Sequence, residues 1–95
     1  MKEISFDEFY QLYQNGQLSL VDVREIEEFK MLHLEGAHNL PLSQLADIYE
    51  QLDKEQLHYV ICKSGMRSAL ACQFLEEHGY KVINVQGGMT AFENL

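Results

Sequence analysis

The sequence predicts an α/β fold, in which a small, mostly parallel β-sheet is flanked by helices on both faces. Three short runs have the apolar, β-branched character of strands and span residues 18–23, 57–61 and 81–85. Stretches with apolar residues at helical spacing lie between these runs. Strands that alternate with helices form βα units, whose strands run parallel and whose helices cover the sheet. The length of 95 residues, of which 46% are apolar, indicates one domain over residues 1–95.

The first half of the chain opens with a well-marked helix. Ser5 and Glu8 have the spacing of a capping box, aromatic residues follow at helical spacing, and Gly16 is placed to end the helix. Pro41 is the only proline, and it follows a short extended segment. The elements expected here are, in order, a helix over 5–16, the strand over 18–23, a short helix over 26–33, an extended piece over 37–40 and a helix over 43–52.

The second half repeats the alternation of strand and helix. The elements expected here are the strand over 57–61, a helix over 68–78 that Gly79 ends, the strand over 81–85, a glycine turn at 87–88 and a last short helix over 89–95. Ligands of parallel sheets bind beyond the carboxyl ends of the strands. The residues that follow Val23, Ile61 and Val85 are therefore the expected site.

Charge narrows the class of partner. The formal net charge is −8, which argues against nucleic acid and against an anionic membrane as partners. Lys63 and Arg67 depart from this trend, because they lie in a segment without acids. A local basic patch on an acidic chain indicates a small anionic ligand at that point.

The cysteine count and the N-terminus indicate a cytoplasmic setting. No apolar run is long enough to cross a membrane, and the first residues do not resemble a signal peptide. Two cysteines are too few for a disulfide scaffold, so free thiols in a reducing compartment are expected. There is no CxxC pair and the histidines are scattered, so no metal site is expected.

Several other polar residues have plainer interpretations. Glu25 and Glu28 are expected on a solvated helix face, and His58 on the surface of a strand. Cys72 lies mid-helix among apolar residues and is expected in the core. The alternative is a redox role, in which Cys72 resolves an oxidised Cys62.

The segment that carries chemistry lies between the second strand and the helix that follows it. It reads Cys62-Lys63-Ser64-Gly65-Met66-Arg67. A loop in this position turns backbone N–H groups toward a common centre at a helix N-terminus and forms an anion cradle. Gly65 permits the tight curl, including a positive φ. The amides and the two cations of the loop are expected to lower the pKa of Cys62 from about 8.5 into the range of roughly 3.5–7.5, which makes it a nucleophilic thiolate at neutral pH.

This loop resembles the active-site loop of the rhodanese-domain sulfurtransferases. The pattern Cys62-x-x-Gly65-x-Arg67 after a strand carries the resemblance, and two further segments extend it over nearly the whole chain. These segments contain Val21-Asp22-Val23-Arg24-Glu25, Glu28-Phe29 and His33-x-x-Gly36-Ala37-x-Asn39-x-Pro41-Leu42, and then Gly87-Gly88-Met89-x-Ala91-Phe92. Three signatures in the family's order make a specific match. The last signature often ends in tryptophan, and Phe92 is expected to be a packing change.

The resemblance implies a rhodanese-like fold and the transfer of sulfane sulfur without a metal or an organic cofactor. Cys62 would be the nucleophile that carries the sulfur as a persulfide. The donor would be bound by the loop residues Lys63, Ser64, Gly65, Met66 and Arg67. Asp22 and Arg24 match family positions near the loop and would support it. The donor would be a small anion such as thiosulfate, or a persulfide, and the acceptor cyanide or a thiol; a protein can be the persulfide donor or acceptor.

Two other functions are compatible with such a fold. The first is a non-catalytic binding module that keeps the rhodanese-like fold, although inactive members of the family commonly lack the loop cysteine. The second is a phosphatase or arsenate reductase with a cysteine in an anion cradle. The loops of those enzymes resemble Cys-x5-Arg, whereas Arg67 gives Cys-x4-Arg here, and the loop has no neighbouring aspartate to act as a general acid.

Overall fold

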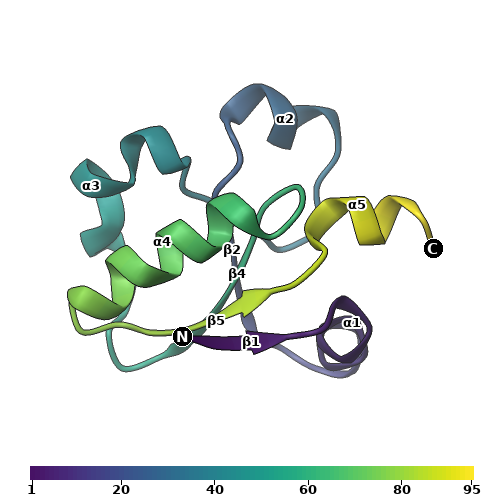
Figure 1. Ribbon diagram of the computed structural model, residues 1–95, viewed down its shortest axis with the longest axis horizontal. Helices are drawn as coiled ribbons and strands as arrows, with labels where there is room; N and C mark the ends of the chain where they lie inside the picture. Colours follow the sequence, from purple (N-terminus) through teal and green to yellow (C-terminus); the bar gives the residue numbers. More distant parts are fainter.

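A five-stranded, all-parallel sheet forms the centre of the computed structural model, which describes residues 1–95 (Figure 1). The strands are β1 (Lys2–Ile4), β2 (Ser19–Asp22), β3 (His38–Asn39), β4 (Leu57–Ile61) and β5 (Lys81–Val85), and they lie in the order β1-β5-β4-β2-β3. The helices are α1 (Phe6–Asn15), α2 (Ile26–Met31), α3 (Leu45–Ile48), α4 (Met66–Glu77) and α5 (Gly88–Glu93), and the short 3-10 helices η1 (Leu42–Gln44) and η2 (Tyr49–Gln51) flank α3. No helix has the length and apolar character that a bilayer-spanning segment needs.

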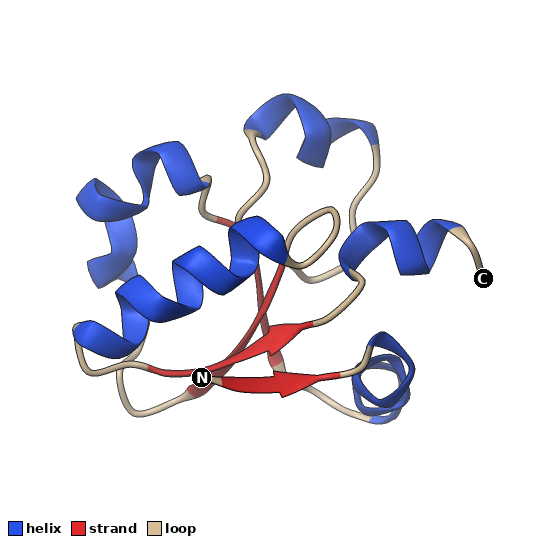
Figure 2. Ribbon diagram, viewed as in Figure 1, coloured by secondary structure: helices blue, strands red, loops and turns tan.

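Helices cover both faces of the sheet, which confirms the predicted fold class (Figure 2). Successive side chains of a strand point to opposite faces, so Val60 and Ile61 of β4 enter different cores. One core joins the sheet to α3 and α4, and the other joins it to α1 and α5. Their buried members include Leu45, Val60, Ala71 and Leu75 in the first core, and Phe6, Phe9, Ile61 and Met89 in the second.

Most helices and strands have bounds close to those predicted from the sequence, and the differences have local causes. β4 and β5 have the predicted bounds, and Ser5 caps α1 by accepting a hydrogen bond from the Glu8 N–H at 3.2 Å. β1 was not predicted, because three residues are too few to show an alternation, yet it pairs with β5. The helix predicted over 43–52 is reduced to α3 between two 3-10 helices. α4 begins at Met66 rather than Ser68, directly after a residue with a φ of 104°.

His58 is a buried residue, so its predicted place on a strand surface is wrong. It is 2% exposed. Its Nδ1 shares a hydrogen bond of 2.6 Å with the Ser19 hydroxyl, and its Nε2 lies 2.8 Å from the carbonyl oxygen of Asp53. Because both ring nitrogens have partners, the ring joins β4 to β2 and to the turn before β4. His58 therefore has a structural role.

Replacement of Leu75 by alanine should test the core beneath α4. Leu75 is fully buried in this core, so Leu75→Ala should lower the free energy of unfolding by about 2–5 kcal/mol. Leu70 lies on the same helix and is 59% exposed, so Leu70→Ala should change stability by no more than about 0.5 kcal/mol. Urea denaturation of both variants measures the difference. Equal losses would contradict this placement of α4.

Candidate active site

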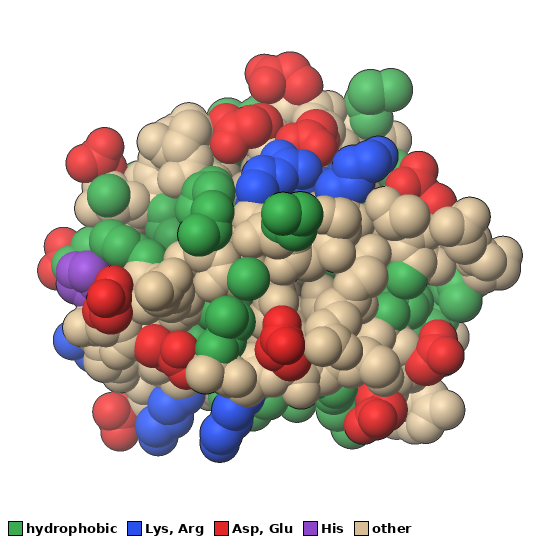
Figure 3. Space-filling model, viewed as in Figure 1, with side chains coloured by type: hydrophobic (Ala, Val, Ile, Leu, Met, Phe, Trp, Pro, Cys, Tyr) green, Lys and Arg blue, Asp and Glu red, His purple; other side chains and the backbone are tan.

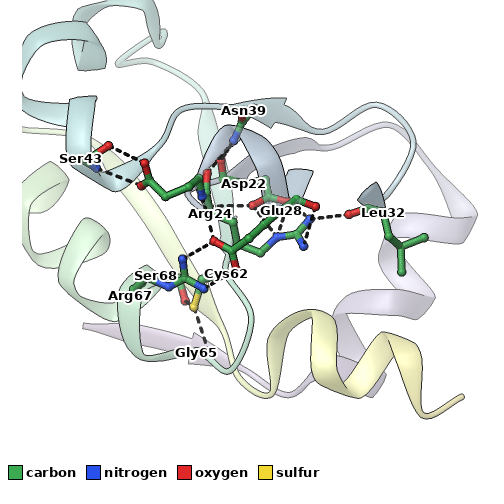
Figure 4. Close-up of polar contacts among 11 residues, drawn as sticks. Asp22, Arg24, Glu28, Leu32, Asn39, Ser43, Cys62, Gly65, Arg67 and Ser68 are labelled. Carbon is green, nitrogen blue, oxygen red and sulfur yellow. Dashed lines mark hydrogen bonds and ion pairs between the residues drawn. The ribbon is translucent and has the colours of Figure 1, made fainter. Parts of the chain in front are cut away.

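The predicted loop lies at the carboxyl end of β4, between the sheet and the N-terminus of α4 (Figure 4). Cys62 directly follows β4 and is 1% exposed. The chain segments that follow β2 and β5 reach the same edge, where Arg24 follows β2 and Gly88 follows β5. The three strand ends named by the sequence therefore do come together, with Cys62 between the other two.

Hydrogen-bond donors surround the sulfur of Cys62. The N–H of Gly65 donates to Sγ at 3.1 Å, and the Ser68 hydroxyl lies 3.2 Å from Sγ. Burial raises the pKa of the Cys62 thiol, but hydrogen bonds from the Ser68 hydroxyl and from the backbone N–H groups of the loop outweigh it, so the pKa is lowered. These N–H groups belong to Ser64, Gly65 and Ser68. The expected lowering of the pKa is confirmed, but its leading causes are hydrogen-bond donors rather than the two cations of the loop.

The first two carbonyl groups of the loop are held by α5. The N–H of Met89 donates to the carbonyl oxygen of Cys62 at 2.8 Å, and the N–H of Thr90 donates to that of Lys63 at 2.9 Å. N–H groups in the first turn of a helix have no partner within the helix, so these bonds satisfy two of them. Since the carbonyls point to α5, the N–H groups that follow are free to face the sulfur.

The carbonyl of Gly65 is held by β5 and by α4. Nδ2 of Asn84, which is buried, donates to it at 3.2 Å, and the N–H of Ala69 donates to it at 3.2 Å. The same Nδ2 also donates to Oε2 of Glu3 in β1 at 3.0 Å. The loop is therefore anchored at both ends to elements outside it.

Gly88 permits the close approach of α5 to the loop. Its φ is 53°, and a Cβ at this position would lie 2.3 Å from the carbonyl oxygen of Cys62 and 2.6 Å from that of Lys63. Backbone atoms cannot yield as a flexible side chain can, so any side chain here would push α5 away from the loop. The glycine turn that the sequence predicts thus sets the position of the anchoring helix.

Arg67 forms an ion pair with Glu28 of α2 (Figure 4). Its two terminal nitrogens donate to the two carboxylate oxygens of Glu28 at 2.7 and 3.0 Å. This bidentate contact, helped by a backbone hydrogen bond, lowers the pKa of Glu28 to about 2. The prediction of a solvated face holds only in part, because the side chain of Glu28 is 35% exposed but the ion pair fixes its carboxylate beside the loop.

Glu25, the other acid expected on that solvated face, is also engaged. Its N–H donates to Oε1 of Glu28 at 3.1 Å, which forms part of a capping box at the start of α2. Its own carboxylate accepts a hydrogen bond of 2.6 Å from the Ser43 hydroxyl. Glu25 therefore links α2 to the start of η1, a contact that the prediction of a solvated residue did not include.

Asp22 and Arg24 form a buried ion pair that holds α2. The terminal nitrogen of Arg24 donates to Oδ2 of Asp22 at 2.8 Å, and both residues are almost wholly buried. The same guanidinium donates to the carbonyl oxygen of Leu32 at 2.7 Å, just after the end of α2. Nδ2 of Asn39 donates to the backbone carbonyls of both members of the pair, at 2.9 and 3.0 Å. Asp22 and Arg24 thus position the helix that carries Glu28, without contact to the sulfur.

The outer side of the loop faces solvent and adjoins a cleft. Lys63, Ser64 and Met66 are exposed, and Met66 is 76% exposed. Lys63 makes no ion pair. It lines a cleft of about 290 Å³ together with Arg24, Glu28, Met31, Leu32 and Glu93. No group of three or more His, Cys, Asp or Glu side chains is placed to hold a metal ion.

Cys72 lies in the core, as predicted. It is fully buried on α4, and burial raises the pKa of its thiol to about 12. It therefore remains a neutral thiol at physiological pH, which makes it a poor nucleophile. Both cysteines are free thiols.

Three contributors to the site were not predicted as such. Ser68 was expected only as the first residue of a helix, yet its hydroxyl contacts the sulfur. Asn84 interrupts an apolar strand, and a buried polar residue at a strand end was the signal that could have found it. Glu28 lies in a segment that carries the family resemblance, but its pairing with Arg67, 39 positions away, cannot be read from spacing.

Comparisons with known proteins identify the family to which this chain belongs. The model of the rhodanese-like domain matches residues 5–95, so the chain belongs to this family. It is 42% identical over 77 residues to YtwF of Bacillus subtilis, named as a candidate sulfurtransferase, and covers 75% of that protein and 81% of its own length. It is 32% identical over 92 residues to the thiosulfate sulfurtransferase GlpE of Shewanella oneidensis, with 96% of the chain and 91% of GlpE covered. The crystal structure of SSP1007 from Staphylococcus saprophyticus is similar, with a TM-score of 0.91, 33% identity, and 97% and 93% of the two chains covered.

Removal of the Ser68 hydroxyl should raise the pKa of Cys62. This hydroxyl is the leading group that lowers the pKa, so in Ser68→Ala the thiolate should form only at higher pH. The rate of alkylation by iodoacetamide, followed for Cys62 by peptide mass spectrometry across pH, reports the midpoint. Ser64→Ala is the matched control, because it keeps the backbone N–H that contributes to the lowering. An unchanged midpoint in Ser68→Ala would contradict the assignment.

Proposed function

We propose that this protein is a sulfurtransferase that carries sulfane sulfur as a persulfide on Cys62. One observation carries the proposal: the sulfur of Cys62 lies among hydrogen-bond donors from Gly65 and Ser68, in a site that lowers its pKa. A thiolate is the reactive form of cysteine, and the same donors can stabilise the terminal sulfur anion of a persulfide. Membership of the rhodanese-like family supports this activity.

In the first half-reaction, the Cys62 thiolate attacks the outer sulfur of the donor. A bond forms between Sγ and that sulfur, and the bond between the outer sulfur and the rest of the donor breaks. With thiosulfate the leaving group is sulfite, and with a persulfide it is a thiolate. The total charge does not change in this step, because one anion enters the site and one anion leaves it. Because Cys62 is 1% exposed, only a donor whose outer sulfur lies at a narrow end of the molecule can reach Sγ.

In the second half-reaction, an acceptor removes the terminal sulfur from Cys62. Cyanide would leave as thiocyanate, and a thiolate would leave as a persulfide. Both half-reactions use the same sulfur atom, so ping-pong kinetics are expected. Small thiols or the cysteine of another protein are suitable acceptors, because Lys63, Ser64 and Met66 form an exposed loop around the site. The cytoplasm would keep Cys62 reduced for this cycle.

The arrangement of Arg67 gives little support to phosphatase or arsenate reductase activity. Both of its terminal nitrogens already bind the carboxylate of Glu28. A phosphate in the cradle would need the same guanidinium as its partner.

The binding-module alternative can be distinguished from the proposal by experiment, since a binding module needs no sulfur on Cys62.

Intact and peptide mass spectrometry after exposure to a sulfur donor should test the proposal. The reduced protein is incubated with thiosulfate or with cysteine persulfide, and the excess donor is then removed. One added sulfur is expected on Cys62, and cyanide should remove it. Cys72→Ser should still take up the sulfur, since Cys72 lies in the core, whereas Cys62→Ser should not. A folded wild-type protein that gains sulfur from neither donor would overturn the sulfurtransferase function and leave the binding module.

A further inference from the structure

The charges around the loop nearly cancel. Arg67 is paired with Glu28, and Arg24 is paired with a buried aspartate. Lys63 is the one cation of the loop without an ion pair, and it lines the cleft together with Glu28 and Glu93. Figure 3 shows a pair of basic side chains at the top of this face, bordered by acidic ones, and further basic side chains near its lower edge. A dianion that approaches the sulfur therefore meets little net positive charge.

Glu28 is the acid that matters most for this balance. Its carboxylate lies 2.7 Å from the guanidinium of Arg67, two residues beyond Gly65 of the sulfur-binding loop. With a pKa of about 2, it stays ionised at any working pH. It thus cancels most of the attraction that Arg67 would exert on an anionic donor, and this cost grows with the charge of the donor.

The cleft beside the loop also offers apolar surface. Met31 and Leu32 line it and are 88% and 44% exposed, and Met66 on the loop is 76% exposed. Contact with an apolar group would remove this surface from water, which favours binding. Thiosulfate has no carbon atom to make such a contact. A persulfide of the form R–S–S⁻ presents the same outer sulfur on a carbon chain.

We propose that Glu28 sets the donor preference of this site: by neutralising Arg67, it favours sulfur donation by carbon-bound persulfides over donation by thiosulfate. This inference rests on the proposed sulfurtransferase function. In the favoured step the Cys62 thiolate bonds to the outer sulfur of R–S–S⁻, the S–S bond of the donor breaks, and R–S⁻ leaves. No electrons are gained or lost overall. The apolar side chains Met31 and Leu32 would contact the R group.

Replacement of Glu28 by glutamine should shift the preference toward thiosulfate. Single-turnover rates of Cys62 persulfidation are measured by mass spectrometry with thiosulfate and with cysteine persulfide. The ratio of the thiosulfate rate to the persulfide rate should rise about three- to tenfold in Glu28→Gln. The rise should shrink at high salt, because the Glu28 side chain is 35% exposed and salt screens such a charge. Glu27→Gln is the matched control, since Glu27 is exposed on the same helix and forms no ion pair.

A second variant separates charge from structure. Arg67→Gln removes the cation and leaves the charge of Glu28 beside the loop, so the same ratio should fall. A merely structural effect would slow both donors equally and leave the ratio unchanged, and thermal melting shows whether each variant is folded. An unchanged ratio in folded Glu28→Gln, or an equal rise in Glu27→Gln, would overturn the role of Glu28 while the sulfurtransferase function stands. Failure of the wild type with both donors would instead overturn the function itself.

Discussion

The orientation of the peptide groups between Cys62 and Arg67 is the constraint on which the site depends. A loop can offer N–H groups to a central sulfur only if its carbonyls find partners elsewhere, because buried carbonyls need hydrogen bonds as much as N–H groups do. The carbonyls of Cys62 and Lys63 bond to the first turn of α5, and that of Gly65 bonds to Asn84 and to α4. The anion cradle therefore depends on α5 and on Asn84 of β5, which hold the loop carbonyls, as well as on the groups that contact the sulfur.

A second network holds the loop from the side of α2. The buried pair of Asp22 and Arg24 fixes the end of this helix, and Glu28 of the same helix fixes Arg67. Removal of one partner from a buried pair leaves an uncompensated charge, so the network specifies one arrangement of the site. It also uses both arginines of the chain, Arg24 and Arg67, for structure. The positive charge left for a donor is then small, which links the architecture of the site to the kind of donor it prefers.

Sequence patterns were sufficient to predict those elements of the fold and the site whose signal lies within one short segment. β4, β5 and the loop between β4 and α4 are contiguous, and Gly65 marks the positive φ that the loop requires. The parallel topology followed from alternating strands and helices, and it brought the right strand ends together. Contributions made across the chain were missed. β1 is too short to show a pattern, although its Glu3 shares the amide of Asn84 that anchors Gly65. The contribution of the two cations to the lowered pKa of Cys62 was also misjudged, because only the structure shows that Arg67 is already paired.

The thiol pKa of Cys62 in Gly88→Ala is the most direct test of this account. The added Cβ would lie 2.3 Å from the carbonyl oxygen of Cys62, so α5 must move and release its hold on the loop. Gly16→Ala is the control, since a Cβ there meets nothing within 4 Å. Thiolate absorbance across pH, with circular dichroism to confirm folding, should show a raised pKa in Gly88→Ala alone, and Asn84→Ala should shift it in the same direction. An unchanged pKa in the folded Gly88→Ala protein would contradict the claim that anchored carbonyls make Cys62 reactive.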